Sequence, residues 1–178
     1  MKAFWKDNSY IIVKLILNQV AMMVFALMVQ SAFLANVTLK VVASVFSVLF
    51  YLFLVATVVY EVGAQDFIRI EAGRMKPQPY RGLWIGLCSG AVNIILGIII
   101  YVSFLFEAPG NTAAGVNAVC VVIANFWQAM YLGLINTFMP ENNLSYILIT
   151  LPALFVCTLV YYLAQKGAIS FNLGTKKE

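Results

Sequence analysis

The chain has 178 residues, of which 63% are apolar or aromatic and 10% are charged, and its formal net charge at pH 7 is +4. A soluble domain of this length keeps apolar residues on one face of each helix and polar residues on the other. Here whole segments are apolar around their full circumference. Composition therefore excludes an ordinary soluble domain and predicts a chain whose surroundings are a lipid bilayer.

Five apolar segments follow one another, and each reaches the roughly 20 residues that a helix needs to cross a hydrocarbon core of about 30 Å. They comprise residues 10–35, 41–63, 82–106, 116–138 and 144–164. The run of residues 94–100 does not alternate apolar and polar side chains, as the strands of a membrane barrel would. We predict an all-α fold, a polytopic transmembrane helix bundle with four or five membrane spans, in a single membrane domain over residues 1–178.

The N-terminus resembles a signal peptide, because Lys2 and Lys6 precede the first apolar segment. That segment is longer than the core of a typical signal peptide, and no small-x-small cleavage site follows it. We expect the segment to be retained as the first span.

Positive charge is spread unevenly over the predicted connections. Lys2 and Lys6 precede the first span, and the loop predicted at residues 64–81 carries four cations, Arg69, Arg74, Lys76 and Arg81. Because positive side chains resist translocation, both regions are expected on the cytoplasmic side. We predict a multi-pass protein of the cell membrane with a cytoplasmic N-terminus.

The short C-terminal tail, residues 165–178, complicates this topology. Its three lysines favour the cytoplasm, whereas five crossings from a cytoplasmic N-terminus would leave it outside. Segment 116–138 is the weakest span, because its amides, Trp127 and Tyr131 suit an interface or a re-entrant hairpin. Two topologies therefore remain open: five full crossings, or four crossings plus one re-entrant or interfacial element.

Glycines recur in the third segment at a spacing that places them above one another on a helix. Gly82, Gly86 and Gly90 are four residues apart, and Gly97 follows two turns later. Small residues let a second helix approach closely in lipid. We predict a helix-packing face, used either within the chain or by a membrane partner or a second copy.

Neutral amides outnumber charges inside the predicted spans. Five of them are candidates for lining a pocket for a small solute: Asn93, Asn117, Asn125, Gln128 and Asn136. Amides that face lipid are costly, so these should face protein or a cavity. The alternative is hydrogen bonding between helices, with Asn93 as a partner for the fourth segment.

The cations of the predicted loop, Arg69, Arg74, Lys76 and Arg81, are interleaved with apolar residues. Such a segment can contact anionic lipid or dock a cytoplasmic partner. A solvated connector is the alternative.

Groups for catalysis are scarce in this sequence. Histidine is absent, which removes the commonest general base and many metal sites, and the three cysteines stand alone, one in each of three segments. No Asp, Glu or His lies deep in a predicted span. We expect no enzyme activity, no metal, no cofactor and no nucleic-acid partner.

Four short sequences, YEVGAQD (60–66), GRMK (73–76), MYLGL (130–134) and VYYL (160–163), resemble small uncharacterised polytopic membrane proteins of Gram-positive bacteria. Size and span count are similar to those of the substrate-binding subunits of modular vitamin transporters. Neither resemblance implies an activity or a functional residue. Our first hypothesis is a noncatalytic subunit or interaction partner in a membrane complex. The alternative is a small-solute binding or transport protein with an amide-lined intramembrane pocket, and a membrane enzyme is a third class.

Overall fold

The computed structural model describes residues 2–33, 36–106, 108, 112–140 and 142–169, and only the backbone of residues 2–4, 6 and 7. All regular structure in these residues is helical, which confirms the predicted class. Three stretches are long and apolar enough to cross a membrane, and two bent helix pairs raise the number to as many as five. The last part of the predicted tail, from residue 170, lies outside the described residues.

The two longest helices form the spine of the molecule. α1 is Lys2–Ala32 and α2 is Val37–Glu71. The Asn36 side chain caps α2 by accepting a hydrogen bond from the backbone N–H of Leu39 at 3.2 Å. Residues 64–71, predicted as loop, continue α2, and the chain leaves the helix near Gly73, whose φ of +68° suits glycine. The connection to the next helix is therefore only residues 72–80.

The third predicted segment is two helices, not one. α3 is Arg81–Ser89 and α4 is Ala91–Leu105, and their axes differ by 59°. Gly90 forms the break, and the Ser89 hydroxyl next to it donates to the carbonyl of Gly86 at 3.1 Å. Glycine weakens a helix and a serine hydroxyl competes for its backbone, so the break has a local cause.

The fourth predicted segment is divided among three elements, α5 (Thr112–Trp127), the 3₁₀ turn η1 (Ala129–Tyr131) and α6 (Leu132–Phe138). The chain bends by 85° between α5 and the pair that follows. Side chains of α1 and α2 bind the backbone opened by this bend. Gln30 donates to the carbonyl of Ala129 at 2.6 Å, and the Ser44 hydroxyl accepts from the N–H of Gly133 at 2.9 Å. Neighbouring side chains commonly satisfy broken helices in this way.

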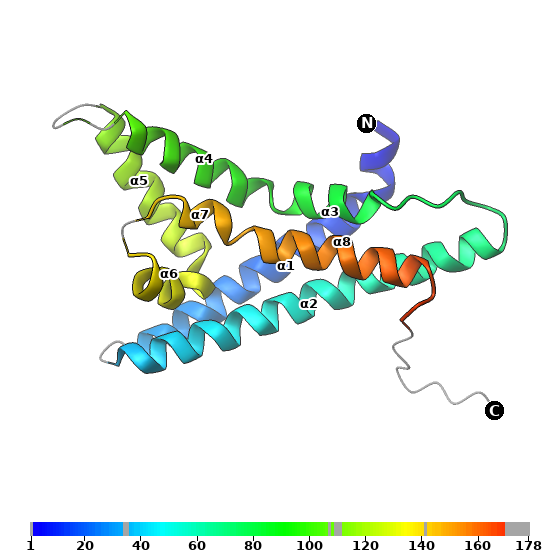
Figure 1. Cartoon of the computed structure of the whole chain (residues 1–178), viewed down its shortest axis with the longest axis horizontal. Coiled ribbons are helices and arrows are strands. Elements are labelled where there is room, and N and C mark those ends of the chain that lie inside the picture. Colours follow the sequence, from blue (N-terminus) through cyan, green and yellow to red (C-terminus); the bar gives the residue numbers. More distant parts are fainter. Residues whose placement is uncertain (1, 34–35, 107, 109–111, 141, 170–178) are drawn as a thin grey trace.

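The last segment consists of a single turn, α7 (Ser145–Leu148), and a longer helix, α8 (Leu151–Gln165). Pro152 lacks the N–H that would bond to the carbonyl of Leu148, which explains the interruption between them. α8 lies against α2 and α3 (Figure 1).

The connections gather at two ends of the bundle (Figure 1). The start of α1, the α2–α3 connection and the end of α8 lie at one end, which we call the basic end because Arg69, Arg74 and Lys76 belong to it. The α1–α2, α4–α5 and α6–α7 connections lie at the other end. The element from α5 to α6 therefore begins and finishes at the same end.

The predicted glycine face packs within the chain. A Cβ atom on Gly82 would lie 2.5 Å from the Cβ of Tyr161 and 2.7 Å from the carbonyl oxygen of Cys157, both on α8. A Cβ on Gly97 would lie 2.7 Å from the Ile147 side chain. Gly86 is likewise close to α8, whereas a Cβ on Gly90 would meet only the carbonyl of Gly86. Three of the four glycines thus let α3 and α4 approach the chain's own last segment.

We expect Gly82→Ala to destabilise the protein by about 1–3 kcal/mol, because the added methyl group overlaps backbone atoms of α8. Thermal unfolding in mild detergent measures the effect. Gly115→Ala is the matched control, since nothing lies within 4 Å of a Cβ at this position of α5. Equal stability of the two variants would contradict the close packing of α3 on α8.

Candidate functional site

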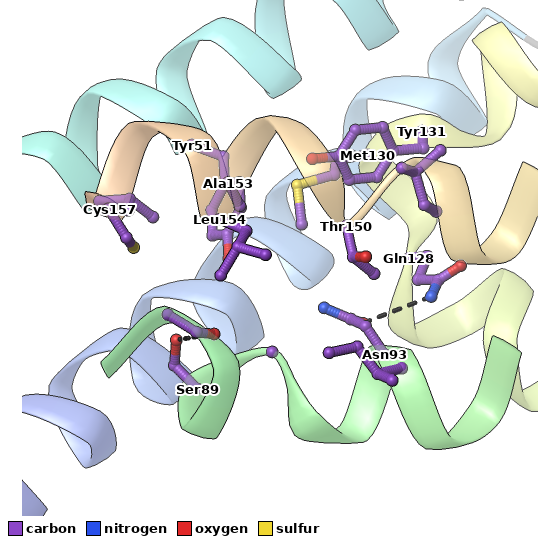
Figure 2. Close-up of a pocket in the computed structure, with 15 residues that line it drawn as sticks. Tyr51, Ser89, Asn93, Gln128, Met130, Tyr131, Thr150, Ala153, Leu154 and Cys157 are labelled. Carbon is purple, nitrogen blue, oxygen red and sulfur yellow. Dashed lines mark hydrogen bonds between the residues drawn. The ribbon is translucent and has the colours of Figure 1, made fainter. Parts of the chain in front are cut away.

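A cavity of about 30 Å³ lies where the three helix interruptions meet (Figure 2). Gly90, Gln128 and Thr150 each come from one interruption and all three line it. Tyr51 of α2 and Cys157 of α8 contribute to the remaining wall. Because the breaks bring irregular backbone and polar side chains into the interior, this cavity is the candidate functional site.

Amide side chains from three elements form a connected group beside the cavity. Gln19 of α1 and Asn93 of α4 exchange two hydrogen bonds, of 2.8 and 3.2 Å. The Gln128 amide donates to the same Asn93 oxygen at 3.4 Å, and the two side chains face each other in Figure 2. This group connects α1 to the segments that follow the Gly90 break and the α5–η1 break. It also fixes Asn93 and Gln128 in the cavity wall.

Two polar groups in the cavity wall have hydrogen-bonding capacity that the described part of the protein does not use. The amide oxygen of Gln128 and the hydroxyl of Tyr131 are buried and have no protein partner there. Gln128 is 1% exposed and Tyr131 is 6% exposed. A buried polar group without a partner costs about 1–3 kcal/mol. Two such groups in one cavity wall therefore require an explanation.

None of the residues that line the cavity carries a formal charge. The available groups are amides, hydroxyls and the Cys157 thiol, which are uncharged hydrogen-bond donors and acceptors. Such a wall suits an uncharged polar molecule, because an anion would find no cation and a divalent metal no carboxylate. Among the described residues no three His, Cys, Asp or Glu side chains cluster as a metal site would require.

The structure brings together two of the five predicted amides. Asn93 and Gln128 line the cavity, whereas Asn125 accepts a hydrogen bond from the Tyr146 hydroxyl at 2.9 Å. Asn117 is buried on α5 and Asn136 is exposed on α6, and neither contributes to the cavity wall. A common spacing along one helix could not separate these roles, because the 85° bend divides the segment.

A charged cluster at the basic end was not expected from the sequence. Asp66 was assigned to a loop, but it lies inside the bundle on α2 and is 1% exposed. One of its oxygens accepts from the Arg81 guanidinium at 2.6 Å and from the Tyr161 hydroxyl at 2.8 Å. Arg81 also donates to the side chain of Asn8 at 2.9 Å. The cluster thus links α1, α2, α3 and α8.

The four predicted loop cations have different surroundings. Arg81 is buried in this cluster, so its guanidinium does not face lipid or a partner. Arg69 is largely exposed at the end of α2 and lies 3.5 Å from Asp66. Arg74 and Lys76 are exposed in the connection between α2 and α3. One sequence signal could have indicated the cluster. Asp66 and Arg81 have opposite charges and stand on either side of a short connection, residues 72–80, that contains two prolines.

Comparison with known proteins gives no further assignment, since no family model, curated protein or solved structure matches the chain.

We expect Asp66→Asn to destabilise the protein by about 3–5 kcal/mol, because it leaves the buried Arg81 charge without its partner. Thermal unfolding in detergent measures this loss. Glu71→Gln, an exposed change at the end of the same helix, is the control and should unfold like the wild type. Asp66→Asn combined with Arg81→Met should be more stable than Asp66→Asn alone, since no unpaired charge remains. A single Asp66→Asn variant as stable as the control would contradict the buried pair.

Proposed function

We propose that the chain is a noncatalytic, multi-pass protein of the cell membrane that binds a small uncharged polar solute between its broken helices, as part of transport. The observation that carries this proposal is the convergence of three helix interruptions on one cavity, whose wall holds an amide oxygen and a hydroxyl without a partner among the described residues. Membrane transporters often bind their substrates where helices are discontinuous, because the breaks supply polar backbone and side-chain groups within the membrane.

The size of the cavity limits what it can enclose in this conformation. A volume of about 30 Å³ accommodates about two water molecules or one small polar group. The free Gln128 oxygen favours a solute that donates a hydrogen bond, and the Tyr131 hydroxyl can donate or accept. These features support a small hydroxyl- or amide-bearing molecule over an ion.

For the topology, we propose four crossings plus a re-entrant element formed by α5, η1 and α6, with the N-terminus in the cytoplasm. The return of this element to the end where it began supports four crossings. Lys166, at the end of α8, then lies at the same end as Arg69 and Arg74. This arrangement removes the conflict between the tail lysines and the positive-inside rule.

The other hypothesis, a subunit that binds a partner through the glycine face, has less support. Gly82 and Gly86 contact α8, and Gly97 contacts α7, so little of that face is left for another chain. The absence of histidine from the sequence supports a noncatalytic role.

Access to the cavity is tested by Cys157, which lines it although the residue is only 2% exposed. In a variant with Cys88→Ser and Cys120→Ser, we expect methyl methanethiosulfonate, a small neutral reagent, to modify Cys157 in membranes. The control is Ala26→Cys in a background without other cysteines, because Ala26 is equally buried and does not line the cavity. If both thiols are equally unreactive by mass spectrometry, small polar molecules do not reach the cavity and the proposal fails.

The bound species is identified by native mass spectrometry of the full chain extracted gently from its own membranes. A retained small molecule that is lost in the Gln128→Leu variant would support the proposed solute site. A second polypeptide in fixed stoichiometry, with no retained molecule, would favour the subunit hypothesis instead.

The topology is tested with single cysteines in a cysteine-free background, labelled in intact cells by an impermeant thiol reagent. With four crossings, Asn142→Cys is expected to react and Ala168→Cys to be protected. Five full crossings from a cytoplasmic N-terminus predict the reverse at both sites. Both residues are exposed in the structure, and Ala108→Cys and Met75→Cys serve as the accessible and protected controls.

A further inference from the structure

A second pocket, which the proposed solute site does not use, lies at the basic end between α1 and α2. Its volume is about 230 Å³, and five charged residues line it, Lys14, Glu61, Asp66, Arg69 and Arg81. Asp66 and Arg81 form its buried floor, whereas Glu61 and Arg69 are exposed at its rim. The pocket therefore opens sideways from the charged cluster toward the surface of the bundle.

The charges of this pocket do not cancel. Three cations face two carboxylates, which leaves a net charge of +1. Arg81 and Tyr161 bond one oxygen of Asp66, and Nη1 of Arg69 lies 3.5 Å from the other oxygen, longer than a good charged hydrogen bond, while the Arg69 side chain is mostly exposed. Lys14 donates to Glu61 at 2.9 Å and has two more N–H groups. Hydrogen-bond donors of Lys14 and Arg69 thus remain for a singly charged anion.

The aromatic residues around the pocket indicate its level relative to the membrane. Tyr10 belongs to its wall, and Tyr80 and Trp84 lie at the start of α3 at the same end of the bundle. All three are exposed, and tyrosine and tryptophan with exposed rings gather at the level of lipid headgroups. In the membrane orientation proposed above, on which this step depends, this is the cytoplasmic headgroup level, where anionic lipids gather.

We propose that this pocket binds the phosphate group of an anionic phospholipid between Lys14 and Arg69. A phosphate diester carries one negative charge, which neutralises the pocket. Its two unbridged oxygens can accept from the lysine ammonium and from a pair of guanidinium N–H groups. Glu61 and Asp66 limit the site to a single charge by holding part of the positive charge in ion pairs.

The test is native mass spectrometry of the delipidated full chain in neutral detergent, titrated with phosphatidylglycerol or phosphatidylcholine. We expect one phosphatidylglycerol to bind preferentially to each wild-type chain. Lys14→Gln with Arg69→Gln should weaken its binding about thirty-fold, the combined effect of two cations at a membrane surface. Arg74→Gln with Lys76→Gln is the matched control, since it removes the same charge from the same end but outside the pocket.

Four outcomes would count against the proposal. Equal losses in both double variants, or equal binding of both lipids by the wild type, would overturn it by showing general attraction or none. Lys14→Arg with Arg69→Lys should retain binding, and its failure while unfolding normally would count against a phosphate-binding site. Inorganic phosphate that displaces the lipid at similar concentrations would overturn the lipid assignment and identify a soluble phosphate compound as the ligand. Lys14 and Arg69 do not line the cavity beside Cys157, so the two sites are tested by separate variants and failure here leaves the solute site to its own test.

Discussion

The buried ion pair between Asp66 and Arg81 constrains the rest of the structure. Neither charge is stable in the interior without the other. The first residue of α3, Arg81, must therefore lie beside Asp66 of α2, which sets the position of α3 along that helix. Tyr161 bonds the same carboxylate oxygen and thereby sets the position of α8 along both helices. With that register fixed, Gly82 lies directly against α8, and the break at Gly90 falls beside the other two interruptions.

The far end of the bundle obeys a different constraint, since it is organised by backbone groups instead of charges. The bend after α5 frees a carbonyl and an N–H that cannot be left unpaired in an apolar interior. Gln30 and Ser44 meet them from the two long helices. The same two helices therefore carry the charged cluster at one end and the polar caps at the other, and the cavity lies between these two layers.

Hydropathy and length were enough to predict the helical segments. A segment surrounded by lipid must be apolar over many consecutive residues, and this pattern is visible in the sequence. A re-entrant or interfacial element at residues 116–138 was one of the two predicted topologies. The breaks at Gly90 and before Pro152 were not predicted, since glycine and proline occur in many continuous transmembrane helices. Asp66 was assigned to a loop because it stands among mixed charges, and its partners are 15 and 95 residues away in the sequence. Asn93 was considered as a hydrogen-bond partner for the fourth segment, and it bonds Gln128. Which amide of that segment meets Asn93 depends on the angles of two bends, 59° and 85°, which the sequence did not provide.

The uncharged cavity and the charged pocket lie close together along α2. Tyr51 and Val55 of α2 line the cavity, and Val58 and Val62 of the same helix line the pocket. One helical turn, about 5 Å of rise, separates the two sets. Val59 and Ile85 line neither compartment, and both are fully buried in the apolar core. A movement of α2 against α3 and α8 that opened one compartment would therefore alter the other, because a close-packed interior transmits displacement over such a distance.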